Sequence, residues 1–299
     1  MSTSAQDYID AFRRGEDFAP PAKNVFANGQ PDESAVKLLG EALAKESPNV
    51  RENIVKLLVD MARQADPLTA KGADVVRHRR IVEVLAGPGL AQADLGRDAA
   101  MEALRKLVPH PDLSRVGEQI TMALDKAPTE DAFLLVAKAK PPAAKATVER
   151  LIALPRWQNV QAARIANAAL GSTASEEPFL RAAADAKTGE ALAVALGPLG
   201  LMGTQRSLRL LGELLRTPLT IEIAGHMPGK SIKSARLDVL DALLYNFPDQ
   251  PVLYPNNINR DEDYRAAERF CTETLGVRYV APPPPYLKYA NVPPEPVQR

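Results

Sequence analysis

The side chains most suited to chemistry are scattered along this chain rather than grouped. The three histidines, His78, His110 and His226, never lie three or four residues apart, and none has a glutamate at metalloprotease spacing. Ser34 and Lys37 match S-x-x-K, but the companion motifs that make this pattern catalytic are absent from the sequence. We therefore expect no catalytic residue, and we interpret Ser34 as part of the first turn of a helix.

A twelve-residue segment from Asn257 to Glu268 resembles a calcium loop in its spacing. Amide and carboxylate side chains fall at its positions 3, 5, 7 and 12. However, Asn257 stands where aspartate is usual, and Glu262 stands where the sharp turn needs glycine. The missing glycine favours the alternative, a helix N-terminus that Asn259 caps and that has an acidic first turn. We expect no metal and no cofactor.

Two other runs could bind an anion. The sequence Arg77-His78-Arg79-Arg80, with Arg63 and Lys71 nearby, could form a basic patch, although a solvated helix face is the alternative. The run from Gly197 to Gly203 is rich in glycine but follows a predicted helix rather than a strand. It therefore lacks the context of a phosphate loop and predicts a helix break.

Composition narrows the classes of protein further. The 37 basic and 37 acidic residues cancel and the pI is about 6.9, which disfavours a nucleic-acid partner. The single cysteine, Cys271, excludes a disulfide within the chain, and we expect it to be a small buried hydrophobe. There is neither a signal-peptide pattern nor a run of ~20 apolar residues. We expect a soluble, cytoplasmic protein without membrane insertion.

The elements that would position these side chains share one recurring phrase. Residues 48–61 read PNVRENIVKLLVDM, and looser versions occupy 78–87, 97–107, 163–171 and 236–244. Each is a helical stripe with apolar residues three, four and seven positions after a lead residue that is often arginine. Such repetition predicts an all-α stack of antiparallel helix pairs with short connections. The predicted helices lie near 5–14, 32–43, 48–61, 74–86, 94–108, 112–127, 129–139, 142–153, 158–170, 176–186, 189–200, 204–215, 235–246 and 260–275.

The segment SPNVRENIVKLLVDM resembles the second helix of a HEAT-type repeat, with a small polar cap, Val-Arg and an aliphatic stripe that ends in leucine. The leucines that align on this pattern are Leu58, Leu104, Leu170 and Leu243. The resemblance implies a right-handed α-solenoid. It also implies a structural role for Arg51, Arg97 and Arg236, which would bind acidic and carbonyl groups of the neighbouring repeat.

Three parts are predicted along the chain. Residues 1–31 form an N-terminal helix and loop, residues 32–276 the solenoid, and residues 277–299 a proline-rich tail. Within the solenoid, 217–234 alternates in hydrophobicity around glycine and proline, which predicts an inserted β-hairpin or extended loop. Within the tail, we expect 281–299 to be polyproline II, either strapping the terminal helices or serving as a ligand motif.

A repeat surface without a catalytic constellation favours a binding module. We expect a scaffold or adaptor, such as an assembly factor or immunity protein, that grips a protein partner. The residues predicted to contact it are His226, Met227 and Lys230, because insertions on a solenoid often lie on its binding face. The main alternative is a HEAT-like nucleic-acid-binding protein or DNA glycosylase-type enzyme, for which Trp157, with Arg156 and Arg164, would be the nearest candidates. A repeat-type lyase or a chaperone for a cofactor-bearing protein is a third.

Overall fold

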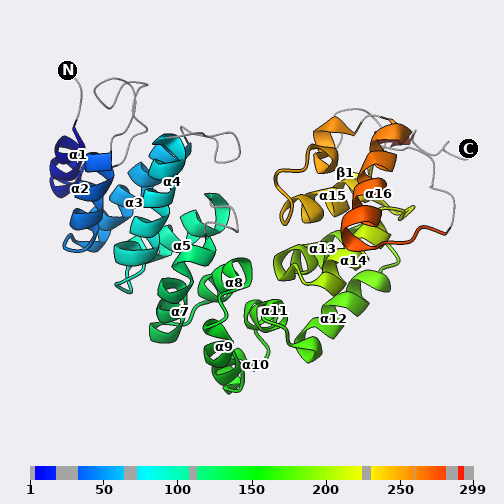
Figure 1. Cartoon of the computed structure of the whole chain (residues 1–299), viewed down its shortest axis with the longest axis horizontal. Helices are drawn as coiled ribbons and strands as arrows, with labels where there is room; N and C mark the ends of the chain where they lie inside the picture. Colours follow the sequence, from blue (N-terminus) through cyan, green and yellow to red (C-terminus); the bar gives the residue numbers. More distant parts are fainter. Residues whose placement is uncertain are drawn as a thin grey trace, which may run out of the picture. The chain divides into compact units, whose positions relative to one another are not determined.

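The computed structural model describes residues 4–17, 33–63, 73–107, 113–223, 230–258, 260–280 and 289–292. The chain divides into two compact units, Met1–Leu170 and Gly171–Arg299. Both consist of helices packed against their neighbours, and the second unit also holds a three-stranded sheet (Figure 1). The prediction of a helical chain with one small β insertion is confirmed for the described residues.

The first unit has two layers of helices. The first layer consists of α2 (Glu33–Leu43), α4 (Ala73–Val84), α7 (Gly117–Lys126) and α9 (Ala144–Ile152). The second layer consists of α3 (Pro48–Arg63), α5 (Leu95–Leu107), α8 (Glu130–Ala139) and α11 (Gln161–Ala169). Within the second layer each helix packs on the next. α3, α8 and α11 also pack on first-layer helices, whereas α5 packs on the turn that follows α4. Short helices complete the unit: α1 (Ala5–Arg13) on α2 and α3, η2 (Leu85–Gly89), η3 (Ser114–Val116) and α10 (Pro155–Gln158).

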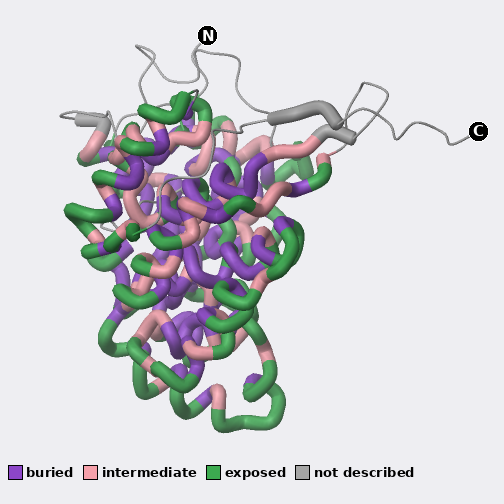
Figure 2. The backbone as a smooth tube through the Cα atoms, turned by 90° about the vertical axis from the view of Figure 1, so that its right-hand side faces the viewer, coloured by how far each residue is buried: buried purple, intermediate pink, exposed green. Residues whose placement is uncertain are grey.

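Helix α3 shows why these segments fold as they do. Pro48 begins it, at a position where the missing N–H costs nothing. The side chains of Ile54, Leu57, Leu58 and Met61 are fully buried and recur at helical spacing. The same pattern in the other helices puts the core between the layers, with exposed residues around the outside (Figure 2).

The helix predicted near 74–86 is followed by a π-helical turn, η2, that contains Gly87-Pro88-Gly89 and continues directly from α4. A wide turn of this kind leaves backbone carbonyls that lack a partner within the helix. The carbonyls of Pro88 and Gly89 each accept a hydrogen bond from the same Nη2 atom of Arg51, at 3.2 Å. The turn therefore provides part of the binding site for a buried arginine.

Arg51 joins two successive first-layer helices. Its side chain is fully buried; Nη1 donates to the carbonyl of Leu43, at the end of α2, and Nε lies 2.8 Å from the Asp94 carboxylate. A cation is favoured at helix C-termini because their last carbonyls are unpaired and carry partial negative charge. Gly96 leaves room for the side chain, since a Cβ there would lie 2.6 Å from the Cβ of Arg51.

Arg97 and Arg236 repeat this role. Arg97 donates from Nη2 to the carbonyls of Ala123 and Ala127, at the end of α7. Arg236 donates to the carbonyl of Leu215 at 2.7 Å. Burial lowers the pKa of both guanidinium groups, yet a guanidinium stays charged at any physiological pH. The structural role expected for Arg51, Arg97 and Arg236 is confirmed by these contacts.

The second unit repeats the layered arrangement. One layer holds α12 (Thr173–Ala184), α14 (Gln205–Leu214) and α16 (Asp261–Leu275), and the other holds α13 (Gly189–Met202) and α15 (Arg236–Leu244). Two 3-10 turns, η4 (Pro251–Leu253) and η5 (Pro255–Asn257), connect α15 to α16. Arg236 spans this unit too, because its guanidinium stacks 3.6 Å from the ring centroid of Tyr264 on α16.

The helix break predicted within Gly197–Gly203 lies at the last residue of this run. Helix α13 runs through Pro198 and ends only at Gly203, which has a left-handed φ of 50°. Pro198 cannot donate to the carbonyl of Val194, four residues earlier. Val194 is 77% exposed, so water can take that bond and the helix continues.

The described residues on either side of 224–229 form two paired strands, as the β-hairpin alternative predicted. Strands β1 (Thr220–Ile223) and β2 (Lys230–Ser234) pair antiparallel, starting from Thr220 opposite Ser234. The tail adds a third strand, β3 (Tyr289–Val292), antiparallel to β2, in the order β1-β2-β3. The expectation of polyproline II therefore fails at 289–292, because the backbone N–H and C=O groups of these residues complete a sheet.

Candidate functional site

A groove lies on the second layer of the first unit and has a volume of about 670 Å³. It runs between α3 and α5 and reaches the start of α8. Lead residue Arg51, near the start of α3, contacts Asp94 just before α5, so the two helices run in the same direction. The floor of the groove is apolar and consists of Val55, Val59, Leu95, Ala99 and Ala103.

Charged side chains form the rims of this groove. On α3, Glu52 pairs with Lys56 at 2.7 Å, one helical turn away. On α5, Glu102 pairs with Lys106, and the hydrogen bond from this ammonium lowers the pKa of the Glu102 carboxyl. Such i,i+4 pairs are exposed and weak, so a partner can exchange them for its own contacts at little cost.

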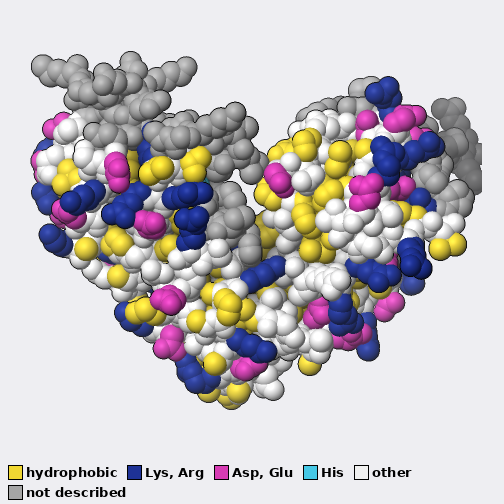
Figure 3. Space-filling view, viewed as in Figure 1, with side chains coloured by type: hydrophobic (Ala, Val, Ile, Leu, Met, Phe, Trp, Pro, Cys, Tyr) yellow, Lys and Arg dark blue, Asp and Glu magenta, His cyan; other side chains and the backbone are white. Residues whose placement is uncertain are grey.

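Charges of both signs lie along the groove. Glu52 and Asp98 lie near the N-terminal ends of α3 and α5, whereas Arg63 and Lys106 lie near the C-terminal ends, where Asp60 also lines the groove. Figure 3 shows basic and acidic side chains interspersed over the visible face of this unit. A groove with an apolar floor and rims of mixed charge suits a polypeptide better than a polyanion.

The sequence contains a signal for this groove that the lead-arginine pattern overlooks. The apolar stripe of 48–61 marks the buried face of α3, whereas Glu52, Lys56 and Val59 lie on the opposite, partly exposed face. Leu95 is 50% exposed at the start of α5. An exposed leucine beside a charged helix face could have pointed to the groove, but only with knowledge that α3 and α5 are neighbours.

Lys138 lies close to the same groove and carries the most perturbed lysine pKa there. Its ammonium donates to the carbonyl of Arg105, near the end of α5, and Arg105 itself pairs with Asp131 on the rim. Burial, and then the charge of Arg105, lowers the pKa of Lys138 to about 8. The geometry places Lys138 as a buried cap on α5 rather than as an open nucleophile.

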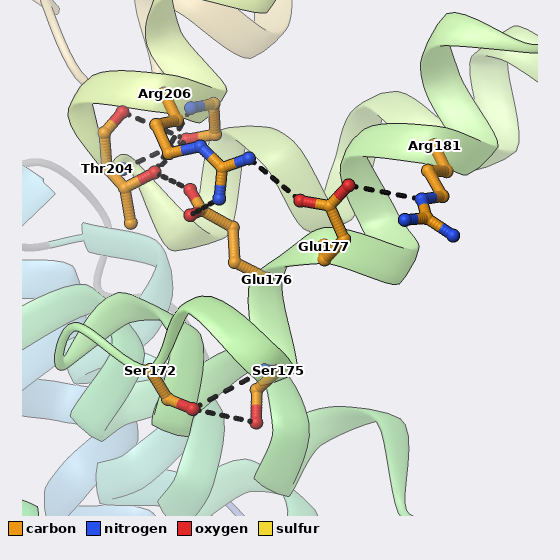
Figure 4. Close-up of polar contacts among 8 residues, drawn as sticks. Ser172, Ser175, Glu176, Glu177, Arg181, Thr204 and Arg206 are labelled. Carbon is orange, nitrogen blue, oxygen red and sulfur yellow. Dashed lines mark hydrogen bonds and ion pairs between the residues drawn. The ribbon is translucent and has the colours of Figure 1, made fainter.

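The second unit holds a polar cluster that ties α12 to α14 (Figure 4). Arg206 lies between two carboxylates, with Nη1 3.1 Å from Glu176 and Nη2 2.8 Å from Glu177. The hydroxyl of Thr204, the N-cap of α14, also donates to Glu176. Glu177 accepts a further bond from Arg181, and Arg206 followed by Arg181 lowers the pKa of its carboxyl. Every charge here has a partner, so we interpret the cluster as a structural clip.

The residues predicted to contact a partner lie at the hairpin. His226 and Met227 fall in 224–229, outside the described residues, between the end of β1 and the start of β2. Lys230 is the first residue of β2, where its backbone pairs with Val292, and its side chain is not described. The structure therefore confirms the hairpin and leaves the predicted contacts of these three side chains as a prediction.

The basic run does not form one patch. Arg77 and His78 are buried in α4, whereas Arg79 and Arg80 are exposed, and Arg80 pairs with Glu83 at 2.8 Å. Successive helical residues point in different directions, so the four side chains divide between the core and the surface. Lys71 lies outside the described residues.

The residues that resemble calcium ligands make structural contacts instead. The last ligand position, Glu268, is buried and accepts two hydrogen bonds from Arg216, at 2.9 and 3.0 Å. Asp263 accepts from the backbone N–H of Arg260, which is the N-cap of α16 in place of the predicted Asn259. Asn259 itself lies outside the described residues. No group of three metal-ligating side chains gathers anywhere in the described part of the chain.

Cys271 and Trp157 are packing residues. Cys271 is fully buried, and burial raises the pKa of its thiol to about 12, which disfavours the nucleophilic thiolate. The indole of Trp157 is 6% exposed and packs on Phe133, with ring centroids 5.1 Å apart. A ring buried in this way is not available to stack on a flipped base, so the glycosylase alternative loses its aromatic residue.

Comparison with protein-family models, with curated proteins and with solved structures finds no match for this chain. No helix within the described ranges is both long enough and apolar enough to cross a bilayer. The class that the fold and the groove define is therefore a layered helical protein with a recess on its second layer.

Proposed function

We propose that this chain is a HEAT-like, right-handed α-solenoid that acts as a non-enzymatic scaffold or adaptor in the cytoplasm. Its protein partner binds the second layer and the inserted hairpin. The observation that carries the proposal is the groove between α3 and α5, with its apolar floor and its charged rims. A partner helix or extended segment could bury its apolar side chains against Leu95 and Ala99. Its charged side chains could pair with the charged residues at the two ends of the groove.

The lead arginines support the HEAT-like assignment. In the first unit, helix pairs alternate between two layers, and Arg51 and Arg97 at the start of second-layer helices bind the ends of first-layer helices. Because these contacts bury charged hydrogen bonds, they hold α3 and α5 in a defined separation. A groove that is already formed loses little entropy when a partner binds, which favours recognition.

The rims support a protein rather than a nucleic acid as the partner. A duplex binds through phosphates to clustered cations, but each basic residue on the α3 and α5 rims has an acidic residue within one or two turns. Among protein-binding roles, adaptor, assembly factor and immunity protein all use such a surface. Buried Cys271 suits a reducing compartment.

A pair of matched substitutions tests the groove. Leu95→Glu places a charge on its floor, whereas Met122→Glu places the same charge on α7, in the first layer, at a residue that is 56% rather than 50% exposed. Each purified variant would be used as bait in native lysate, beside a chain whose residues 224–230 are replaced by a Gly-Ser linker.

The proposal predicts a stoichiometric protein that the wild type and Met122→Glu retain and that Leu95→Glu loses at least ten-fold. Loss with the Gly-Ser linker would add the hairpin to the interface. Equal retention by Leu95→Glu and Met122→Glu would remove the groove from the interface. If no protein is retained by any bait, the scaffold proposal fails.

A further inference from the structure

The two edges of the small sheet differ in what covers them. Strand β1 lies against α13, where Gly189 approaches the carbonyl of Thr220 so closely that a Cβ would lie 2.1 Å from its oxygen. The N–H of Glu222 on the same edge donates to the Glu190 carboxylate at 3.1 Å. Helix α13 therefore closes the β1 edge to any additional strand.

At the β2 edge, the strand that the structure describes is β3. Tyr289 lies opposite Lys233 and Val292 lies opposite Lys230, so four residues pair along nearly the whole of β2. β3 belongs to the end of the chain, and α15, α16 and the segment APPPPYLK separate it from β2. No tight turn joins the two strands, so their pairing carries the entropy cost of closing a long loop.

We propose that the β2 edge is a strand-binding site, that β3 is its occupant within the chain, and that an extended segment of the protein partner replaces β3. A four-residue strand contributes few ladder hydrogen bonds, and a segment of similar length can match them. For the natural source of that segment, the inference rests on the proposed function. The binding capacity of the edge itself does not depend on it.

β3 shows which chemistry the edge accepts. The incoming segment must run antiparallel to β2 and must lack proline at the paired positions, because proline cannot donate to the ladder. In the register of β3, a small residue lies opposite Ile232 and an aromatic residue opposite Lys233. Lys233 also pairs with Asp238, so its charge is partly compensated within the unit.

The test uses the tail sequence as a probe. A fluorescent peptide of residues 287–294, LKYANVPP, would be titrated against the full chain and against a full chain carrying Ala290→Pro and Asn291→Pro. Adjacent strand residues point their N–H groups to opposite sides, so one of these two must donate to β2. The double variant should free the edge and bind the peptide at least ten-fold more tightly than the wild-type chain does. A peptide with the same two prolines is the control and should not bind.

A second bait, ending at Val280, keeps the proposal testable if the double variant loses its cooperative unfolding. Failure of the peptide to bind any folded bait, or equal binding by the wild-type chain and the variants, would overturn the proposal. If the wild-type chain sediments as a dimer in which the tails are exchanged, the strand comes from a second copy of the chain and not from the protein partner. If a partner is captured but the peptide does not bind, the proposed function is supported and the strand-binding edge is overturned. If the peptide binds but no partner is captured, the strand-binding edge is supported and the proposed function is overturned.

Discussion

At the scale of single residues, buried cationic side chains donate hydrogen bonds to the carbonyls at the C-terminal ends of helices. Arg51 and Lys138 each donate to carbonyls near the end of a helix, and both side chains are almost entirely enclosed. A helix end leaves carbonyls without partners, and burying such an end is costly unless a donor reaches it. These side chains therefore serve to join helices, and their energetics can be tested singly.

Removing Arg51 should be strongly destabilising. Arg51→Met leaves the carbonyls of Leu43, Pro88 and Gly89 without their donor and Asp94 without its cation. We expect the free energy of unfolding to fall by about 3 kcal/mol, as for other buried pairs that lose one partner. Urea denaturation measures this.

The control for this measurement is Arg80→Met, in the same unit. Arg80 is exposed and makes an i,i+3 pair with Glu83, so its loss should cost less than about 0.5 kcal/mol. Similar losses for both variants would show that Arg51 does not hold the layers together.

Lys138 should make stability depend on pH. Its folded pKa, about 8, lies below the ordinary value of 10.5, because burial disfavours the ammonium. Between these two values the unfolded chain holds a proton that the folded chain has lost, so stability rises as pH increases from about 8 to 10.5. Below pH 8 the buried ammonium carries its full cost.

The matched variant is Lys138→Met, which lacks this titration. The free energy of unfolding of the variant minus that of wild type should be largest near pH 7 and should fall by up to about 3 kcal/mol towards pH 10. Denaturation of both proteins at several pH values gives the two curves. Parallel curves would mean that Lys138 titrates normally.

At the scale of elements, helix positions could be predicted well from periodicity, and the reasons for the misses are local. Leu58, Leu104 and Leu243 of the aligned pattern are fully buried, as a repeat stripe requires. Leu170 instead lies at the C-cap of α11, partly exposed, so the pattern there is one residue too long. Pro198 does not end α13, because a proline is tolerated where the carbonyl that it leaves without a donor faces water.

Substitutions at two glycines of α13 test whether the strand β1 packs closely on this helix. Gly189→Ala would place a Cβ 2.1 Å from the carbonyl oxygen of Thr220, so β1 must move and stability should fall by about 2 kcal/mol. Gly197→Ala meets no atom within 4 Å apart from its chain neighbours. Its gain in helix propensity, about 0.5–1 kcal/mol, is offset because Pro198 crowds the Cβ of a preceding helical residue, so stability should change little. Thermal unfolding of the two variants compares them within one helix. A harmless Gly189→Ala would show that β1 is not packed on α13.

At the scale of the whole molecule, the sequence predicts the class of fold and the hairpin, but it predicts neither the groove nor the strand β3. Repeated stripes predict a stack of helices, and alternating hydrophobicity predicts the hairpin. The groove depends on which faces of α3 and α5 lie side by side, and β3 depends on pairing between segments more than fifty residues apart. Neither contact leaves a local pattern, so a single sequence does not reveal it. The predicted division into 1–31, 32–276 and 277–299 stays a prediction beside the two compact units observed.

The most direct test of the central claim, that a protein partner binds the second layer, is lysine cross-linking with mass spectrometry on the chain captured with its partner from native lysate. In the first unit, Lys56 and Lys106 line the second-layer groove, whereas Lys37, Lys126 and Lys145 are exposed on first-layer helices. Cross-links from Lys56 and Lys106 to one partner protein, with few from the other three, are the predicted result. Cross-links confined to Lys37, Lys126 and Lys145, or none to any protein, would contradict the account.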